Sequence, residues 1–340
     1  MTSNLNTSSL VTALKAAAEP TRLRILLLLS AGELNVKDLT EILGQSQPRI
    51  SRHLKLLTEA GLVERFRDGS WVYFHVSDRT EGGRLTLGLL DAVDASDPVL
   101  SRDRERSDVL KRQREGSAQT YFQDHAADWD RIRAMHVAEH DVEAAMLASL
   151  GPGPFRMFLD LGTGTGRILE LFADHYERGL GLDVNNPMLS LARSRLVGAG
   201  LAHAQVRHGD IYQLALPDKT ADAVIMHQVL HHLSEPQRAI QEAARVLAPG
   251  GRMLIVDFAP HECEFLRQDF AHERLGFADT QVENWLREAG LAARGVQHLK
   301  PSAREGGEKL TVSIWLAERA GTAPLSGPVV KTRKLERTGQ

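Results

Sequence analysis

The feature that most constrains the fold of this chain is a loop of alternating glycine and threonine, Gly162 to Gly166. Met157 to Leu161 predicts a short buried strand directly before the loop, and Arg167 to Ala173 predicts a helix directly after it. Glycines at such a turn let the backbone bend sharply and approach a ligand closely, as in doubly wound sheets that bind ligands at the carboxyl ends of their strands. Because a glycine loop alone is a weak signal, the residues around it decide the interpretation.

Carboxylates follow the next predicted strands at positions that suit a nucleoside ligand. Leu180 to Leu182 predicts a second strand that ends in Asp183, 23 residues after Asp160, at the spacing where a carboxylate accepts both ribose hydroxyls. Asp210 follows a third strand, and a fourth leads to His227. This order predicts an α/β Rossmann-like domain. The alternative, in which Asp183 and Asp210 are only loop or cap carboxylates, is less favoured because all these features occur in order.

A different pattern occupies the first quarter of the chain. Asn35 and Ser46 each cap a predicted helix, and a glycine follows both helices. In the second of these helices, residues 47–60, Ile50, Leu54 and Leu57 are spaced by four and three and are expected to face inward. Polar donors are left outside, where they suit phosphate and base contacts in a DNA major groove. These candidates are Gln47, Arg49, Ser51, Arg52 and Lys55, with His53 as a phosphate-side or hydrogen-bonded histidine.

A β-hairpin is expected next. An Asp68-Gly69 turn joins two alternating runs, residues 62–67 and 70–76, and Arg65 and Arg67 would stand beside its tip. The helices and the hairpin together predict a winged helix-turn-helix of the α+β class. A helix-turn-helix used only for protein contact is less favoured, because the hairpin arginines and the helix donors would converge on one surface.

The first quarter of the chain resembles the ArsR family of bacterial repressors. The resemblance rests on Glu19 to Leu26, on Ser51 to Val63 and on the hairpin segment Asp68 to Tyr73. It implies a dimeric repressor that binds double-stranded operator DNA. The family's best-known metal site uses two cysteines where this chain has Asn35 and Lys37, and a lysine ammonium cannot ligate a metal as a thiolate does. We therefore expect no metal to be sensed there, and no metal cofactor.

The order of strands, glycine loop and carboxylates from Tyr121 to Ala317 resembles class I S-adenosylmethionine-dependent methyltransferases, in particular the ubiquinone and menaquinone C-methyltransferase group. The resemblance implies that Asp160 and the loop hold the methionine part of the cofactor, Asp183 the ribose, Met188 one adenine face, and Asp210 with Ile211 the adenine edge. Tyr121, Phe122 and Trp129 match an aromatic segment that closes over the cofactor. The implied cofactor-binding residues are Tyr121, Asp160, Gly162, Thr163, Gly164, Gly166, Asp183, Met188, Asp210, Ile211 and His227.

Catalytic residues are less defined. Methyl transfer from a sulfonium depends mainly on in-line positioning, so no dedicated motif is required. His227, His231 and His232 lie where substrates approach in such folds, and one of them is a candidate general base. They are equally compatible with capping and packing the helix after the strand. Arsenite methylation is disfavoured, because it needs several thiolates and Cys263 is the only cysteine.

Length and composition fit two domains. The chain has 340 residues and a formal net charge of −3, so any DNA-binding surface must be a local patch. Residues 1–9 lack the order of a signal peptide, and no apolar run approaches the roughly 20 residues that a bilayer requires. We therefore expect a cytoplasmic protein without a membrane segment.

Four segments are expected along the chain. Residues 1–97 would form the winged helix DNA-binding and dimerisation domain, with Leu85 to Val93 in the dimerisation helix. Residues 98–118 would form a charged, exposed linker helix, residues 119–318 the methyltransferase-like domain, and residues 319–340 a disordered basic tail.

The whole arrangement is similar to that of S-adenosylhomocysteine-responsive regulators of methionine-cycle genes. It implies a homodimeric repressor whose effector is S-adenosylmethionine or S-adenosylhomocysteine. The alternative is an active methyltransferase of a small molecule with an autoregulatory DNA-binding domain, and the sequence leaves this choice open.

Overall fold

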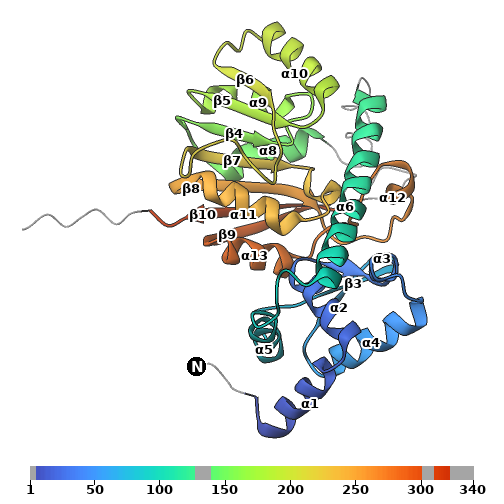
Figure 1. Cartoon of the computed structure of the whole chain (residues 1–340). Coiled ribbons are helices and arrows are strands. Elements are labelled where there is room, and N and C mark those ends of the chain that lie inside the picture. The colour runs from blue at the N-terminus through green and yellow to red at the C-terminus, as the bar shows by residue number, and fades with distance from the viewer. Residues whose placement is uncertain (1–4, 127–138, 301–309, 322–340) are drawn as a thin grey trace, which may run out of the picture.

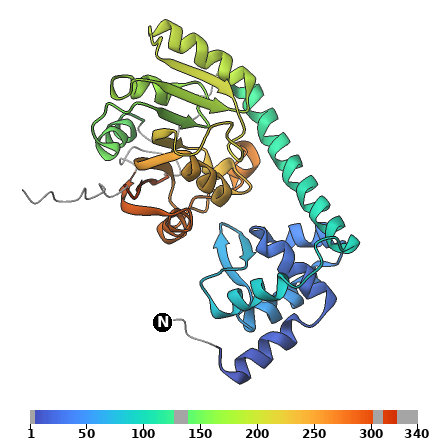
Figure 2. The ribbon, with the colours of Figure 1, turned by 60° about the vertical axis from the view of Figure 1, so that its left-hand side comes forward.

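The computed structural model describes residues 5–126, 139–300 and 310–321. Two domains lie one beyond the other, and a single long helix runs beside both (Figure 1, Figure 2). Trp129 and the tail beyond Gly321 lie outside the described residues. No helix within the described ranges is long and apolar enough to span a bilayer.

The first domain combines helices with a small antiparallel sheet of order β1-β3-β2. Its elements are α1 (Thr7–Ala17), α2 (Pro20–Ser30), β1 (Leu34–Asn35), α3 (Val36–Leu43), α4 (Gln47–Glu59), β2 (Glu64–Asp68), β3 (Trp71–His75) and α5 (Glu81–Leu90). The hairpin β2–β3 is the wing. Asp68 is the last residue of β2 and pairs with Trp71, so the turn is Gly69-Ser70, one position later than the expected Asp68-Gly69. The predicted winged helix-turn-helix is confirmed.

Local signals set the ends of these helices. The side chains of Asn35 and Asp38 form a reciprocal capping box at the start of α3, and Gly44 ends that helix with a left-handed φ of 64°. Ser46 precedes α4 as expected, but its side chain makes no capping hydrogen bond. Pro48 lies in the first turn of α4, where a missing N–H costs no helical hydrogen bond.

The connection between the domains is α6 (Pro98–His125), a helix of 28 residues that contains the linker expected at 98–118 and continues beyond it. The sequence suggested that this helix is exposed all round. In the structure, the side of α6 that faces the first domain is buried. Asp103 is buried and accepts hydrogen bonds from the Arg24 guanidinium at 2.6 and 2.7 Å, and Leu110 packs in the core of the first domain. The charged residues suggested a solvated spacer, but one of them, Asp103, attaches α6 to α2 through its ion pair with Arg24.

The second domain is an α/β fold around a seven-stranded sheet of order β6-β5-β4-β7-β8-β10-β9. Its strands are β4 (Phe158–Leu161), β5 (Gly179–Asp183), β6 (Ala204–His208), β7 (Ala221–His227), β8 (Leu247–Phe258), β9 (Leu291–Leu299) and β10 (Val312–Arg319). Neighbours from β6 to β8 are parallel, whereas β10 is antiparallel to both β8 and β9. The expected Rossmann-like architecture is confirmed.

Helices cover both faces of this sheet (Figure 1). They are α8 (Glu139–Leu150), α9 (Arg167–Leu171), α10 (Asn186–Gly198), α11 (Pro236–Val246), α12 (Phe265–Asp269) and α13 (Asp279–Glu288), with 3₁₀ turns η2 (Ala173–His175) and η3 (Leu230–His232). Successive strand residues alternate between two cores: Phe158 packs with α8, α9 and α10, while Leu159 packs with α11 and α13. Because the central strands are buried on both faces, they are mostly apolar, and the carboxylates Asp160 and Asp257 near their carboxyl ends are exceptions.

Candidate functional site

The glycine loop follows β4 and is hydrogen-bonded to the carboxyl end of the neighbouring strand β5. The backbone N–H groups of Gly162 and Thr163 donate to the carbonyl of Leu182 at 2.9 and 3.0 Å. Gly162 has φ 72°, and a Cβ there would lie 2.5 Å from a methyl group of Val229, so the turn requires glycine. The Thr163 hydroxyl donates to the buried Asp160 carboxylate at 2.6 Å. The loop and both carboxylate-bearing strands are thus brought together as the sequence predicts.

Asp183 is the central acceptor of this edge. Its Oδ2 accepts the Gly164 N–H at 2.8 Å, and its Oδ1 accepts the Asn185 N–H at 2.8 Å. Burial raises the pKa of Asp183, although the backbone donors of Asn185 and Gly164 oppose the rise. Each carboxylate oxygen carries two lone pairs, so Asp183 retains acceptor capacity for a ligand hydroxyl beside its backbone donors.

The candidates for the adenine part lie on the neighbouring elements. Met188 is buried in the first turn of α10, whose N-cap Asn185 accepts the Met188 N–H at 3.1 Å. Ile211 is half-buried, whereas Asp210 is exposed and accepts the Tyr212 N–H at 2.8 Å. The local hydrogen bond of Asp210 is the kind that a loop carboxylate makes, and it leaves a second oxygen for a ligand.

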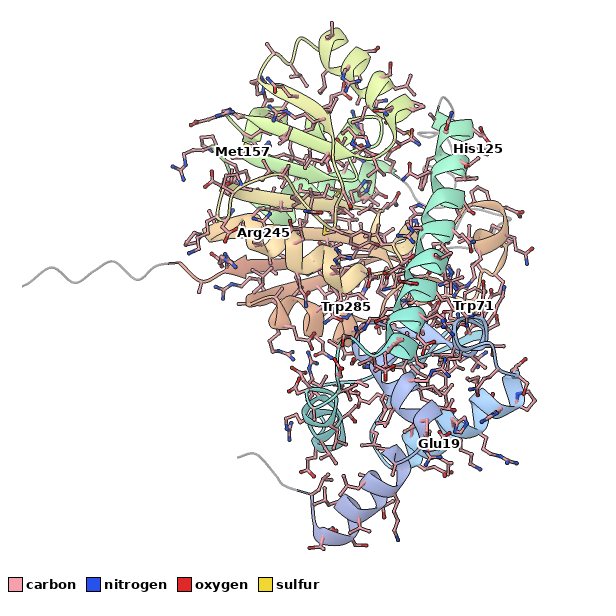
Figure 3. All side chains as sticks on the ribbon, in the orientation of Figure 1. Glu19, Trp71, His125, Met157, Arg245 and Trp285 are labelled. Carbon is pink, nitrogen blue, oxygen red and sulfur yellow. The ribbon has the colours of Figure 1, made fainter. Side chains whose placement is uncertain are left out.

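The end of α6 lies against this edge of the second domain. The Asn185 amide donates to the carbonyl of Gln119 at 3.3 Å. Tyr121 stacks on His125 with 4.3 Å between ring centroids, and Phe122 meets the His232 ring edge-on at 4.7 Å. Figure 3 shows His125 at this far end of α6. The aromatic segment and the strand ends are therefore adjacent, and Asn185 is a contact that the sequence did not reveal.

A histidine cluster occupies the carboxyl end of β7. His227 is buried at the end of that strand, and His231 and His232 follow in η3. The His231 Nδ1 lies 2.7 Å from Asp257 Oδ1, and both side chains are almost fully buried. The His232 Nδ1 donates to the carbonyl of Ala271 at 3.0 Å, and burial lowers the pKa of His232 well below 6.5. Asp257 was missed, although its place at the end of β8 resembles that of Asp183 on β5.

The candidate DNA-contacting face of α4 is exposed. Ile50, Leu54 and Leu57 face the core as expected, and the polar donors lie on the opposite side. Those exposed donors are Gln47, Arg49, Ser51, Arg52 and Lys55. His53 does not share this face: it is buried 3.8 Å from Glu19 Oε2, and burial lowers its pKa.

The wing arginines differ from each other. Arg65 is exposed on β2. Arg67 donates through Nε to the Gly69 carbonyl at 2.8 Å, and its Nη2 lies 4.0 Å from Glu262 of the second domain. Arg67 therefore borders the second domain, while its side chain remains 71% exposed.

The tip of the wing is bound by the second domain. Asp68 Oδ1 accepts the Arg267 guanidinium at 3.0 Å and the Leu275 N–H at 2.9 Å. The Ser70 N–H donates to Glu264 Oε1 at 2.6 Å. A Cβ on Gly69 would lie 2.6 Å from the side chain of Leu275, so the approach is as close as glycine permits. We call this set the wing contact.

Two arginines reinforce the wing contact through aromatic rings. Arg267 lies over the Trp71 ring, with 4.3 Å from Cζ to the centroid, and Arg274 lies over Tyr73 at 3.9 Å. Arg274 is 2 % exposed and pairs with Glu33 at 3.0 Å. Trp71 marks this junction of the domains in Figure 3. No local pattern predicts these pairs, because their members lie in different domains.

Family models match both halves of the chain. The model of bacterial regulatory proteins of the arsR family matches residues 19–65, and a methyltransferase domain model matches residues 159–255. The chain joins an ArsR-type helix-turn-helix to a methyltransferase domain. The two resemblances read from the sequence are therefore confirmed.

Individual relatives match the methyltransferase half. A ubiquinone/menaquinone biosynthesis C-methyltransferase of Ruegeria sp. is 31% identical over 156 residues, which cover 44% of this chain and 62% of that protein. A demethylmenaquinone methyltransferase of Clavibacter sepedonicus is 26% identical over 213 residues, 62% of this chain and 84% of that protein. An uncharacterized methyltransferase of Bacillus subtilis is 31% identical, and the match covers 42% of it. The chain thus spans less than two thirds of the Ruegeria and Bacillus proteins.

A solved structure agrees on the fold. A methyltransferase from Haloferax volcanii, solved in complex with a methyltransferase activator, has a TM-score of 0.50 and 20% identity. The match covers 58% of this chain and 97% of that one. At this identity the likeness establishes the architecture of the second domain.

Proposed function

We propose that this ArsR-type protein is a homodimeric transcriptional repressor whose methyltransferase domain binds S-adenosylmethionine or S-adenosylhomocysteine as an effector of operator binding, with methionine-cycle genes as targets. Methyltransferases among its relatives support a cofactor of this kind. The loop and Asp183 supply the backbone approach and the carboxylate that a ribose needs. Leu85, Leu89 and Val93 of the expected dimerisation segment are only partly buried against the first-domain core.

The observation that carries this proposal is the wing contact. The tip residues Asp68 and Gly69 are buried against the second domain, so they have no access to a DNA phosphate in this arrangement. The segment that holds them, residues 264–275, follows β8. In the sheet, β8 lies next to β7, and the carboxyl ends of these parallel strands share one edge with the glycine loop and Asp183, which we call the ligand edge. A ligand that favours one position of this segment changes the population of chains whose wing is available to DNA.

A linkage experiment tests the proposal. Operator duplexes are first selected from a random pool with the full-length protein, and each nucleoside is then titrated with and without operator. Because linkage is reciprocal, a nucleoside that changes operator affinity by some factor must have its own affinity changed by the same factor. Equal nucleoside affinities in the presence and absence of operator would remove the effector role.

An active methyltransferase is the second candidate, and the His231–Asp257 pair favours it. Asp257 accepts the His231 Nδ1–H at 2.7 Å, which makes Nε2 the basic nitrogen of the ring. With S-adenosylmethionine bound as the methyl donor, Nε2 of His231 would accept the proton that an acceptor hydroxyl or amine loses on methylation. Radiolabelled methyl transfer to extracted small molecules tests it, with His231→Gln expected to lose the activity.

A further inference from the structure

Three histidines from two separate segments meet near the end of α6. His231 and His232 belong to η3, and His272 belongs to the loop after α12. One ring nitrogen of each histidine lies within 4.8 Å of the corresponding atoms of the other two. The centroid of the His231 ring lies 3.9 Å from that of His232 and 4.1 Å from that of His272. The three imidazoles therefore bring one nitrogen each into the same small space.

Neighbouring acceptors orient two of these rings through Nδ1. Asp257 accepts from His231 Nδ1, and the same Asp257 Oδ1 accepts the Phe258 N–H at 2.8 Å, which fixes the carboxylate. The carbonyl of Ala271 accepts from His232 Nδ1 at 3.0 Å. A ring that donates through Nδ1 carries its lone pair on Nε2, and a neutral imidazole binds a metal through the nitrogen that carries the lone pair. Metal-binding histidines typically have such a carboxylate or carbonyl partner on the other nitrogen.

The backbone on both sides of the cluster adopts unusual conformations. Ala271 has φ 53° and Gln228 has φ 51°, and both are non-glycine residues in the left-handed region. The Ala271 conformation lets its carbonyl meet His232 while His272 follows directly. Such conformations cost free energy and often occur at functional sites.

We propose that His231, His232 and His272 bind one divalent transition-metal ion of the zinc class. Imidazole nitrogens suit zinc, copper, iron and nickel better than calcium or magnesium. Three protein ligands leave a coordination position open for water or a substrate atom. The site lies in the methyltransferase domain, apart from residues 33–39, for which the sequence argued against a metal. The metal site does not depend on the effector proposal. It does compete with the general-base alternative, because both would use Nε2 of His231.

The position of this site connects it to the wing contact. The backbone N–H groups of Glu273 and Arg274 donate to the carbonyl of His231 at 2.8 and 3.0 Å. A metal bound by His231 and His272 would add a second connection between η3 and the segment that holds Asp68 and Tyr73. The ion would therefore stiffen the support of the wing.

Cobalt titration tests the metal site. Full-length protein without an affinity tag is stripped with a chelator and titrated with Co²⁺, whose visible absorption reports tetrahedral nitrogen ligation, and the ion is then displaced with Zn²⁺. We expect one equivalent to bind. His272→Ala should weaken binding at least tenfold. The control His140→Ala, at a histidine whose side chain is 94% exposed on α8, should bind like the wild type.

A positioning variant and a folding check complete the test. Asp257→Asn should weaken binding by about 10- to 100-fold, because the carboxylate orients His231. Far-UV circular dichroism verifies that each variant is folded, and His272→Asn replaces His272→Ala if the latter unfolds. The proposal fails if the wild type gives no visible band, or if a folded His272 variant and His140→Ala titrate alike.

Discussion

A single carboxylate, Asp183, organises the ligand edge of the second domain. It fixes the glycine loop through the Gly164 N–H and begins the next helix through the Asn185 N–H. The same side chain is thus both a structural acceptor and the candidate ribose partner. The structural role and the ligand-binding role of such a residue can be distinguished only if ligand affinity and folding are both measured.

Asp183→Ala is expected to weaken binding of both nucleosides. Ribose hydroxyls left without their acceptor cost about 1 to 3 kcal/mol, which corresponds to roughly 5- to 150-fold in affinity. Isothermal calorimetry measures the loss, and Asp174→Ala, at an exposed carboxylate in η2, is the control. Unchanged affinity in a folded Asp183→Ala protein would contradict our placement of the ligand.

The pH dependence of nucleoside binding should also report on Asp183. Burial raises its pKa above the ordinary value of 3.8, and the ionised form is the one that accepts hydrogen bonds with both oxygens. Affinity should therefore be full near neutral pH and decline as the pH falls through the raised value, before ordinary aspartates protonate. Calorimetry from pH 7 downward checks this, and an affinity that stays constant to pH 4 would be inconsistent with it.

Among the elements, α4 divides its two faces in the manner required of a recognition helix. Its apolar residues are buried, and its basic residues are exposed on the other face. The wing, by contrast, is held by the second domain. The two elements that an ArsR-type protein offers to DNA are therefore in different states in this structure.

Arg52→Ala should weaken operator binding. If Arg52 contacts a phosphate, the loss should be nearly uniform across DNA sequences, and the slope of log affinity against log salt should decrease by about one unit. Fluorescence anisotropy over a salt series measures both quantities. Arg193→Ala, exposed on α10, is the matched control, and identical slopes for the two variants would argue against a DNA role for α4.

Arg267→Ala should release the wing and strengthen operator binding in the absence of nucleoside. The variant removes the partner of the buried Asp68 carboxylate, and a lost charged hydrogen bond of about 1.5 kcal/mol corresponds to roughly tenfold in affinity. Arg294→Ala is the control, because exposed Arg294 of β9 pairs with Glu318 of the neighbouring β10, and neither residue belongs to the wing contact. Equal or weaker operator affinity in a folded Arg267→Ala protein would show that the wing contact does not restrain DNA binding.

At the scale of the molecule, α6 joins the domains by ion pairs on both of them. Arg114 pairs with the buried Asp38 of α3 and, at 2.8 Å, with Glu273 of the second domain. Lys111 pairs with Glu235 at 2.7 Å. The same helix contacts the ligand edge through Gln119. Figure 2 shows α6 continuing from one domain to the other without a break. The helix therefore contacts both α3 and the strand ends that carry Asp183.

Arg114→Ala should lower the free energy of unfolding of the protein, because it removes ion pairs of α6 with both domains. Removing one partner of a buried pair costs about 3–5 kcal/mol, and the partial exposure of Arg114 favours the lower end of that range. Urea unfolding monitored by circular dichroism measures the free energy of unfolding. Arg112→Ala, exposed on the same helix, is expected to change it by less than about 0.5 kcal/mol. Equal effects of the two substitutions would remove the proposed role of Arg114.

The sequence determined the features that depend on neighbours along the chain. The capping box at Asn35, the β2–β3 hairpin and the glycine loop each follow from local backbone preferences and side-chain spacing, although the hairpin turn lies one residue later than predicted. The apolar periods fixed the buried face of α4 and the two-sided burial of the central strands. Parallel strand order then placed Asp160 and Asp183 at one edge without reference to any distant contact.

Only the tertiary structure decided which distant polar groups meet. Asp68 with Arg267, Arg274 with Tyr73, and His231 with His272 come from segments whose local sequence favours no particular partner. His53 illustrates the same limit, since its place in α4 suggested a DNA contact and its burial beside Glu19 depends on how α4 packs against the preceding helices. Burying an ion pair costs the desolvation of both charges, and only close packing of the two partners in good geometry offsets that cost. That geometry is set by how distant segments pack, and no spacing along the chain encodes it.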